Sequence, residues 1–391
     1  MNLRPCRVEI STRALADNYR FLSNLAGSAA EVLAMVKADA YGHSLALCAP
    51  AAVRAGARWL GVTSVEEALQ ARSLCPDARV LVMTGCFPRE GAAALRHNLT
   101  PVAWDQWQLD ELEGAARSAG LGAGSVAVHL EIDSGMSRQG VAPEDLGPIL
   151  ARFGAETPLR LEGVLTHLYA ADESDGLTDH AQLARLDEAL ARIAAAGLKP
   201  NWLSAGASAT LLSGGLAQVA DIAAKRGMKA MIRPGLALYG VAPQFVPDEP
   251  AAVTEARKGL KPVLSWKAQV ASVRSVPVGA AVGYNGTFVA TEPMRLALLP
   301  VGYADGLDRR LGNRSSLLVR GQRAPLVGRV SMDLAVIDVT EIDGVEPGDE
   351  VVILGAQGAE TITADEHAGA TGTIPWEVFT RIGARVPRLP L

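Results

Sequence analysis

The stretch VLAMVKADAYGH, residues 32–43, begins with a short apolar run that ends in a lysine, Lys37. Seven more short apolar runs follow it, with helical segments between them. Short strands that alternate with helices are typical of a parallel α/β fold. The runs span residues 32–36, 59–63, 80–83, 100–103, 126–132, 161–166, 200–203 and 229–232. Eight strands with intervening helices favour a (β/α)8 barrel over an open doubly wound sheet.

The connecting segments 65–74, 107–118 and 178–196 have the apolar spacing of amphipathic helices. After residue 243 the pattern changes to closely spaced strands with glycine and proline turns, at 265–276, 295–300, 317–319, 334–339 and 350–354. We therefore predict an α/β chain with an N-terminal (β/α)8 barrel over residues 11–242 and a C-terminal mainly β domain over 243–391. Residues 1–10 are candidates to join the β domain, and the charged, proline-containing segment 243–261 is the predicted boundary.

The composition is that of an ordinary globular protein. The chain has 391 residues, of which 49% are hydrophobic and 20% charged, and its net charge is -5. A length of this size corresponds to two or three domains at ~150 residues each. The 37 basic residues form no stripe along the sequence, so we expect no nucleic-acid partner.

The four cysteines, Cys6, Cys48, Cys75 and Cys86, form no CxxC pair. This spacing argues against zinc, iron–sulfur and disulfide frameworks, and we predict buried thiols and no metal site. The first residues lack the apolar core of a signal peptide, and no stretch reaches the length that spans a bilayer. A cytoplasmic enzyme without a membrane partner is the expectation.

Barrel enzymes carry their catalytic residues at the carboxyl ends of the strands, so polar residues at those positions are candidates. Lys37 ends the first strand. Desolvation there would lower its pKa and make it an amine nucleophile or a Schiff-base former. A lysine at a strand end can also extend into water, and Lys37 taken alone favours that plainer interpretation.

Two further strands end in polar residues. The fifth runs into HLEIDSGMSRQG and directs Glu131, Asp133 and Arg138 to the same rim. The sixth ends in GVLTHLYAADE with His167 at its tip. Its position on the rim favours a functional role for His167, but a structural imidazole with satisfied hydrogen bonds is an equal alternative.

The loops after strands seven and eight, SAGASATLL and IRPGLALYG, contain small and hydroxylated residues. In barrels these loops often bind a phosphate through backbone N–H groups. Ser208 and the amides near Gly235 and Leu236 fit that function. The alternative is a helix-capping serine and a turn glycine.

A rim lysine opposite a phosphate-binding loop suggests pyridoxal 5'-phosphate, which needs an amine and phosphate donors. The run MVKADAYGH resembles the cofactor-lysine motif of alanine racemases. The resemblance continues, in order, through HLEIDSGMSRQGV, LTHLYAAD, IRPGLALYGVAP, VGYNGTF, LPVGYADGLDRR, VGRVSMD and RVPR. It covers nearly the whole chain.

The resemblance implies a homodimer of barrel-plus-β-domain subunits with shared active sites, each closed by the β domain of the other subunit. The residues that match the family's cofactor-binding positions are Lys37, Tyr41, His167, Ser208, Arg233, Gly235 and Leu236. Among them, Lys37 would hold the cofactor and Tyr41 would contact its phosphate. Arg233 would face the pyridine nitrogen, with His167 supporting it.

The resemblance also implies the substrate contacts and the proton-transfer groups. Arg138 would lie beside the cofactor's phenolic oxygen, and Met332 with Asp333 would meet the substrate carboxylate. Racemisation removes a proton from one face of the α-carbon and returns one to the other, so it needs two opposed bases. Lys37 and Tyr284 would be that pair.

The chain departs from the family pattern at four positions. Glu131 replaces a lysine that is often carbamylated, and Ser331 replaces a frequent cysteine. Ala384 and Trp376 stand where tyrosines are common, and the loss of a tyrosine at Ala384 would widen the entrance. Strict specificity for alanine is therefore open.

The predicted function is interconversion of L- and D-alanine to supply D-alanine for peptidoglycan, with a broader-specificity amino-acid racemase as the alternative. Decarboxylases of similar architecture place an acidic residue at the pyridine nitrogen, so Arg233 argues against them. A non-enzymatic cofactor carrier would have no use for a second base such as Tyr284.

Overall fold

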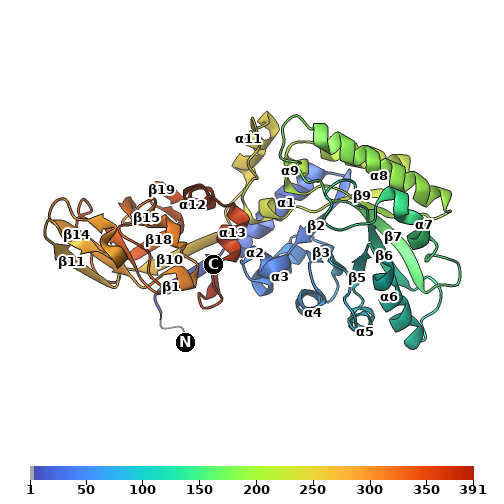
Figure 1. The fold of residues 1–391 in the computed structure, drawn as a ribbon, viewed down its shortest axis with the longest axis horizontal. Coiled ribbons are helices and arrows are strands. Elements are labelled where there is room, and N and C mark those ends of the chain that lie inside the picture. Colours follow the sequence, from blue (N-terminus) through green and yellow to red (C-terminus); the bar gives the residue numbers. More distant parts are fainter. Residues whose placement is uncertain (1–3) are drawn as a thin grey trace. The chain divides into compact units, whose positions relative to one another are not determined.

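The computed structural model describes residues 4–391 and divides into two compact units (Figure 1). The barrel unit consists of Arg13–Ala40 and Leu45–Lys261. The β unit consists of residues 4–12, Tyr41–Ser44 and Pro262–Leu391. The short segment after the rim lysine thus groups with the β unit, although the chain on both sides of it is part of the barrel unit. The domain limits inferred from composition remain a prediction.

The predicted barrel is confirmed, because eight parallel strands form a closed ring in chain order, β9 pairing with β2. The strands are β2 (Ala30–Met35), β3 (Trp59–Val62), β4 (Arg79–Val82), β5 (Thr100–Ala103), β6 (Val126–Glu131), β7 (Leu159–Leu165), β8 (Trp202–Ser204) and β9 (Lys229–Ile232). Each overlaps one of the eight predicted apolar runs, with ends that differ by at most two residues. β3 and β5 are buried along their whole length, as expected for strands enclosed by side chains within and helices outside.

Helices cover the outside of the barrel (Figure 1). They are α1 (Thr12–Ala26), α3 (Leu45–Arg54), α4 (Val65–Leu74), α5 (Gly91–Arg96), α6 (Gln106–Ser118), α7 (Leu146–Leu150), α8 (Leu177–Ala195), α9 (Ser208–Leu212), α10 (Leu216–Lys225) and α11 (Ala251–Gly259). In α8, the longest of these helices, Leu183, Leu186, Leu190 and Ile193 form one buried stripe at helical spacing. The predicted helices 65–74, 107–118 and 178–196 correspond to α4, α6 and α8. No helix within residues 4–391 combines the length and apolarity needed to cross a bilayer.

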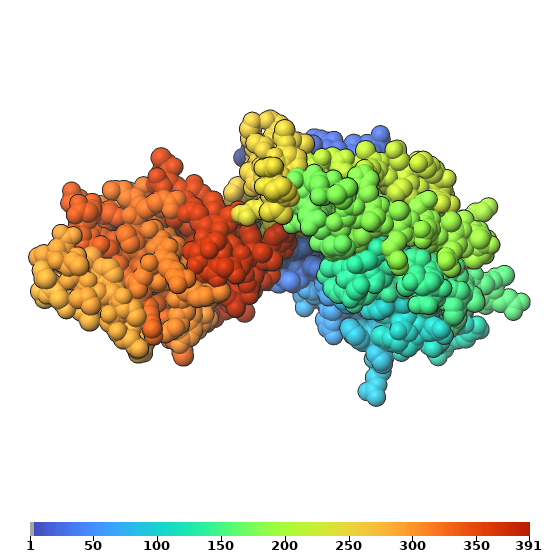
Figure 2. Space-filling model, turned by 45° about the horizontal axis from the view of Figure 1, so that its top comes forward, coloured from blue at the N-terminus to red at the C-terminus, as the bar shows by residue number. Residues whose placement is uncertain are grey.

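The β unit contains three sheets. The largest has the order β16-β15-β18-β10-β1-β20, with β19 paired to β18; the others are β11-β14-β17 and β12-β13. The strands are β1 (Cys6–Ile10), β10 (Leu264–Gln269), β11 (Ser272–Val276), β12 (Ala281–Val282), β13 (Phe288–Val289), β14 (Met294–Leu299), β15 (Ser316–Val319), β16 (Gln322–Pro325), β17 (Ala335–Asp338), β18 (Glu350–Gln357), β19 (Glu360–Ile362) and β20 (Arg388–Pro390). Helices α12 (Ala364–Thr371) and α13 (Pro375–Thr380) complete the unit, whose surface Figure 2 shows in orange and red.

The single strand predicted over residues 265–276 is wrong, because the structure divides it into β10 and β11. The reason lies at two consecutive residues. The Val270 N–H donates to Asp349 O at 2.9 Å, and the Ala271 N–H donates to Leu298 O at 2.8 Å. The chain therefore leaves one sheet and enters the next at this point, which the apolar pattern alone does not reveal.

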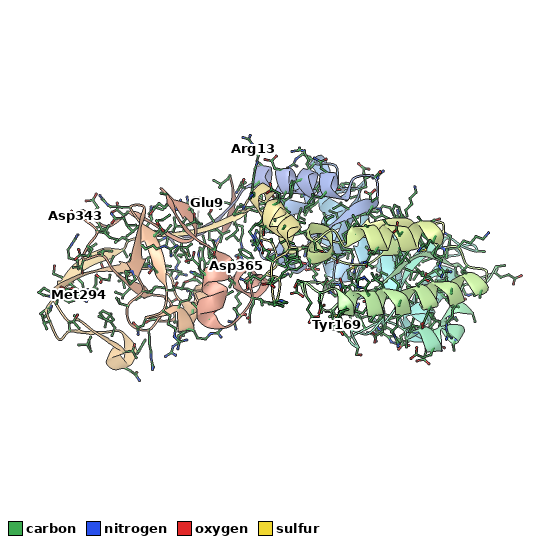
Figure 3. All side chains as sticks on the ribbon, turned by 90° about the horizontal axis from the view of Figure 1, so that it is seen from above. Glu9, Arg13, Tyr169, Met294, Asp343 and Asp365 are labelled. Atoms are coloured by element: carbon green, nitrogen blue, oxygen red, sulfur yellow. The ribbon has the colours of Figure 1, made fainter. Side chains whose placement is uncertain are left out.

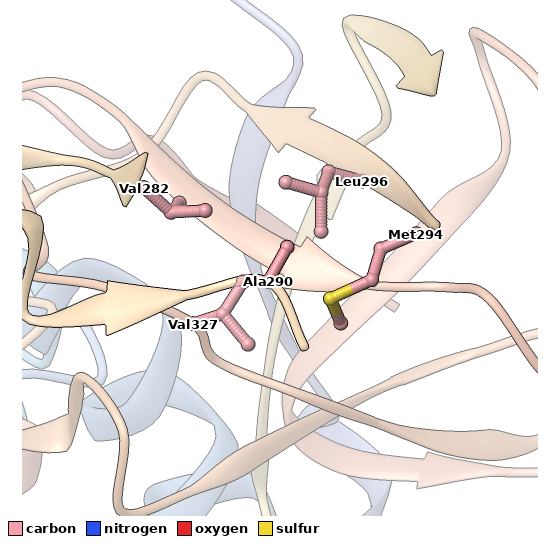
Figure 4. Packing of buried hydrophobic residues seen from close by; sticks show 5 residues of the cluster. All are labelled: Val282, Ala290, Met294, Leu296 and Val327. Atoms are coloured by element: carbon pink, nitrogen blue, oxygen red, sulfur yellow. The ribbon is translucent and has the colours of Figure 1, made fainter. Parts of the chain in front are cut away.

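A small apolar cluster supports the strands β12–β14 of this unit. Val282, Ala290, Met294, Leu296 and Val327 pack together and are each at most 6% exposed (Figure 4). One member of the cluster, Val282, directly precedes Gly283, so the cluster anchors the start of the segment that carries Tyr284. The predicted buried thiols are also confirmed, since all four cysteines are free and buried.

Candidate active site

The chain makes an unusual turn directly after the rim lysine. The short element α2 (Lys37–Tyr41) is left-handed, with φ of 53° at Ala38, 52° at Asp39, 56° at Ala40 and 55° at Tyr41. A left-handed helical conformation costs an L-residue about 1–2 kcal/mol, so four consecutive residues persist only where the surroundings hold them. Such strain concentrates at functional sites, which directs attention to Lys37.

Lys37 is half-buried among cationic groups. Burial lowers its pKa, and the nearby positive charges of Arg138 and Arg233 lower it further. The carboxylates of Glu67 and Glu131 act in the opposite direction. A lysine with a lowered pKa carries a larger fraction of free amine near neutral pH, as a nucleophile or base requires.

Arg233, at the end of β9, is buried and held by neighbouring strands. Its Nη1 donates to Ser204 Oγ at 2.6 Å, and its Nη2 donates to the Thr166 carbonyl at 2.7 Å. The same Nη2 lies 3.4 Å from Nδ1 of His167. Because a guanidinium only donates hydrogen bonds, this Nδ1 acts as the acceptor and the imidazole is neutral.

The electrostatics agree with a neutral His167. Burial lowers the pKa of its imidazole, and the positive charges of Arg233, Arg138 and Lys37 bring it to about 3. The structure therefore brings together three of the predicted residues, Lys37, His167 and Arg233. It also favours a specific role for His167 as a neutral partner of Arg233.

The loops after β8 and β9 meet at Ser208. The Ser208 hydroxyl accepts hydrogen bonds from the N–H groups of Gly235 and Ala237, both at 3.1 Å. Leu236, between them, is 1% exposed and begins a 3-10 turn, Leu236–Tyr239. Ser208 thus fixes the backbone of the second loop from the first, so these predicted residues form one unit.

A second hydroxyl in the same region has no partner. Thr210 Oγ1 is buried and makes no hydrogen bond within residues 4–391. Gly206 approaches the Thr210 side chain so closely that an added Cβ would lie 2.4 Å from Oγ1. The loop after β8 is therefore tightly built around a polar group that still needs a hydrogen-bond partner.

Arg138 lies in the loop after β6, and its side chain is exposed. Asp133 shapes this loop by accepting from the N–H groups of Gly135 at 2.9 Å and Ser137 at 3.0 Å. The neighbouring Gln139 donates its side-chain amide to the Glu131 carboxylate and, at 3.3 Å, to the carbonyl of Met83 on the rim of β4. The loop that carries Arg138 is thereby attached to two strands.

Glu131 is 3% exposed. Burial raises the pKa of its carboxyl, although the hydrogen bond from Gln139 and the charges of Arg233 and Arg138 oppose this effect. No direct hydrogen bond joins Glu131 to Arg138 among the residues that the structure describes, so its influence on Arg138 passes through the field of its charge and through Gln139.

Tyr41, Tyr284 and Met332 belong to the β unit. Tyr41 is 8% exposed, whereas Tyr284 and Met332 are 67% and 54% exposed. Met332 is held by its backbone, since its carbonyl accepts from the Ala304 N–H at 3.0 Å. Gly302 packs so closely against it that a Cβ would lie 2.4 Å from the Met332 carbonyl.

A network of ion pairs supports the segment that carries Met332, and the sequence alone did not indicate it. Asp305 is fully buried and accepts from the guanidinium groups of Arg4 and Arg385 and from the Gly302 N–H. Arg385 also contacts the carboxylate of Asp333. Through this network Asp305 fixes the residue that follows Met332.

Three supporting residues were absent from the predicted site: Glu67, Gln139 and Asp305. Glu67 stands three residues after Ser64, a spacing typical of a helix capping box. A capping role already explains a glutamate at this position, so the sequence does not indicate that Glu67 contacts the distant Ala38 turn. Gln139 could have been noticed as the neighbour of Arg138, but no pattern indicates where its amide points.

Fold and site together define a class: a (β/α)8 barrel with a rim lysine, joined to a mainly β unit with an exposed tyrosine. The models of the alanine racemase N-terminal and C-terminal domains match residues 10–243 and 263–390. The chain belongs to the alanine racemase family. The predicted family and enzyme class, an isomerase that racemises amino acids, are confirmed.

The chain is similar over its whole length to curated and solved members. An alanine racemase of Sorangium cellulosum is 38% identical, with 99% of each chain covered. The structure of the alanine racemase of Streptomyces lavendulae, a producer of D-cycloserine, superposes with a TM-score of 0.88 at 33% identity, covering 100% of this chain and 98% of that one. The structure from Bartonella henselae, which contains covalently bound pyridoxal phosphate, gives 0.82 at 27% identity, with 99% of each chain covered.

Proposed function

We propose that this protein interconverts L-alanine and D-alanine with pyridoxal 5'-phosphate, using Lys37 and Tyr284 as its two acid–base groups. The observation that carries the proposal is the setting of Lys37: a half-buried amine with a lowered pKa, placed between β2 and a strained turn and near Arg233 and Arg138. The substrate follows from the family, whose similar members are named alanine racemases.

The residues present fit the cofactor. The unpartnered hydroxyl of Thr210 and the hydroxyl proton of Ser208, whose oxygen accepts from the Gly235 N–H beside Leu236, offer donors suited to a phosphate. Lys37 would hold the cofactor's carbonyl carbon, and Tyr41 is the further phosphate ligand in the proposal. When bound, pyridoxal phosphate supplies an electron sink that acidifies the α C–H bond of an attached amino acid.

Arg233 and His167 would act at the pyridine nitrogen. An arginine with a pKa above ~12 donates a hydrogen bond without giving up its proton. Because the His167 pKa is about 3, the imidazole also stays uncharged and supplies no proton near neutral pH. This pair would therefore leave the ring nitrogen of the cofactor unprotonated, which would discourage side reactions.

Proton transfer would use one base on each face of the α-carbon. Lys37 Nζ takes or returns the proton on one face, and Tyr284 Oη does so on the other. Arg138 and the Met332 segment would bind the substrate, with Met332 held by the Asp305 ion network. Each base acts as acid in one direction and as base in the other.

A homodimer with shared sites is part of the proposal. Tyr284 and Met332 are large side chains that are 67% and 54% exposed, whereas Lys37 is half-buried and its neighbours Arg233 and Glu131 are buried in the barrel unit. A second copy of the chain would cover these side chains and bring Tyr284 to the partner's Lys37. The proposed role is supply of D-alanine for peptidoglycan in the cytoplasm, which rests on the family assignment.

The direct test is incubation of the purified protein with pyridoxal phosphate and either L- or D-alanine, followed by chiral analysis. Both reactions should approach equal amounts of the enantiomers, because enantiomers have equal free energy. Borohydride reduction and peptide mapping should place the pyridoxyl group on Lys37. Absence of racemisation, or a label on another lysine, would contradict the proposal.

A broader-specificity racemase is the second candidate. Ala384 is exposed and Trp376 is half-buried, and both differ in size from the common tyrosines. A panel of L-amino acids including serine decides between the candidates. A larger kcat/KM for any of them than for alanine would favour the broader enzyme.

A further inference from the structure

We propose that Glu67 is a positioning residue for Lys37: its carboxylate clamps the left-handed turn that follows the lysine to the rim of the next barrel strand. The inference rests on the proposed function in one respect, that Lys37 is the catalytic amine. It concerns a glutamate on α4 that lies outside the sequence motifs of the site.

The clamp consists of two hydrogen bonds. Glu67 Oε1 accepts from the N–H of Ala38 at 2.6 Å, and Oε2 accepts from the N–H of Thr63 at 2.9 Å. Ala38 is the first left-handed residue after Lys37, and Thr63 follows the last residue of β3. One carboxylate therefore spans two neighbouring strand ends, with one oxygen on each.

The turn has few other supports within the barrel unit. The N–H of Ala40 donates to the Val36 carbonyl at 2.9 Å, and Asp39 accepts from the Leu45 N–H at 2.6 Å. Both bonds connect residues that lie close together in the sequence. Leu45 begins α3 only six residues after Asp39, whereas Glu67 lies on α4, 29 residues after Ala38. The bond to Glu67 therefore fixes the turn to a part of the barrel that is more distant in the chain.

The position of the turn decides where the lysine side chain points. On its N-terminal side Lys37 is fixed by the end of β2. The residue before it, Val36, donates its N–H to the carbonyl of Gly61 in β3 at 2.8 Å. On its C-terminal side the backbone reverses hand at Ala38. If the Ala38 amide were released, the turn could relax toward right-handed backbone, which costs less energy, and the Cα–Cβ direction of Lys37 would change.

Glu67 also acts on the charge state of Lys37. Its negative charge raises the Lys37 pKa, against burial and the two arginines. Removal of the charge and the clamp would therefore leave the amine both less well placed and less basic. A displacement of about 1 Å at a reacting group can reduce the rate by about 100-fold.

Glu67→Gln is the main test, because glutamine keeps the shape but offers one acceptor oxygen instead of two. Glu66→Gln is the matched control: Glu66 is the exposed neighbour on α4, and its carboxylate interacts with its own N–H and with Ser64. Glu67→Asp, which keeps the charge and shortens the reach, serves as a second variant if Glu67→Gln does not fold.

The first measurement is amide hydrogen exchange of the protein without cofactor. In Glu67→Gln, exchange should accelerate about tenfold or more at whichever of the Ala38 and Thr63 amides loses its acceptor oxygen, and should stay unchanged at both amides in Glu66→Gln. Protection of both amides equal to that of the control would overturn the clamp.

The second measurement is the steady-state kinetics of alanine racemisation. Glu67→Gln should lower kcat by about tenfold or more with a smaller change in KM. Because loss of the negative charge lowers the Lys37 pKa, the alkaline limb of the rate profile should move to lower pH. Accelerated exchange with unchanged kcat and pH profile would show that the turn is held for stability only, and would overturn the positioning role. Inactivity of the unaltered protein would contradict the proposed function alone, because the exchange measurement involves neither cofactor nor reaction.

Discussion

The carboxylate of Glu131 accepts a hydrogen bond from the side-chain amide of Gln139, the residue directly after Arg138. The same amide reaches the carbonyl of Met83. The negative group at position 131 thus acts on the arginine loop through its neighbour. This arrangement replaces direct contact between Glu131 and Arg138.

The reversed pair provides a test of this link. Gln139→Glu places two carboxylates together, so one must bind a proton, and kcat should fall about tenfold or more at pH 8 and recover as the pH is lowered. Glu131→Gln combined with Gln139→Glu restores one donor and one acceptor and should return kcat to within about threefold of the unaltered protein. The pH profiles of kcat for both variants check this expectation.

Asp133 and the two arginines, Arg138 and Arg233, also face Glu131 and are the same in every variant. Cofactor affinity, measured by absorbance titration, should therefore change little. A double variant as impaired as Gln139→Glu would show that the hydrogen bond between residues 131 and 139 does not place Arg138.

Tyr284→Phe should retain the cofactor and lose racemisation by about 100-fold or more, the contribution of a positioned proton-transfer group. The measurement is kcat in both directions with each enantiomer of alanine. Full activity in this variant would remove the tyrosine from the mechanism.

Mixtures of Lys37→Ala and Tyr284→Phe subunits should recover activity, because in a shared-site dimer one of the two sites would carry both native groups. Mixing each variant with itself is the control. A racemase that is active as a monomer in sedimentation experiments would contradict the shared site.

His167 should make stability depend on pH. Its pKa is about 3 in the folded chain and about 6.5 in the unfolded one. The unfolded state therefore binds the proton first, and the contribution of His167 is complete above pH 6.5 and is lost as the pH falls toward 3. Between pH 7.5 and pH 5 the free energy of unfolding should decrease by about 2 kcal/mol from this group.

Urea unfolding at the two pH values, compared between the unaltered protein and His167→Asn, isolates that contribution. The variant should lose less stability on acidification. An equal loss in both proteins would place the folded-state pKa of His167 near its ordinary value.

Ser208→Ala removes the acceptor of two buried N–H groups, at Gly235 and Ala237. We expect a loss of about 2 kcal/mol in the free energy of unfolding and weaker phosphate binding by the apoprotein. Ser213→Ala is the control at the residue that directly follows the same short helix, because the Ser213 hydroxyl makes a long bond of 3.5 Å to the Thr210 carbonyl. Thermal unfolding with and without inorganic phosphate distinguishes the two variants.

Tyr169, labelled in Figure 3, lies in the segment between β7 and α8 and is 54% exposed, which its place in the motif LTHLYAAD does not indicate. The sequence likewise does not indicate where the side chains of Gln139 and Glu67 point. Their side chains act on loops from other strands, and the direction of a side chain depends on the packing of the whole barrel.

The sequence by itself determined the barrel, because its strands and helices are local apolar patterns that recur eight times, and each of the eight runs became a strand. It also determined the family, because the motifs that carry Lys37 and Tyr284 are contiguous residues. Only the tertiary structure decided the left-handed turn after Lys37, the exchange of sheets at Val270 and the contacts of Glu67. These depend on groups far apart in the chain, whose hydrogen bonds and charges meet only once the fold has formed.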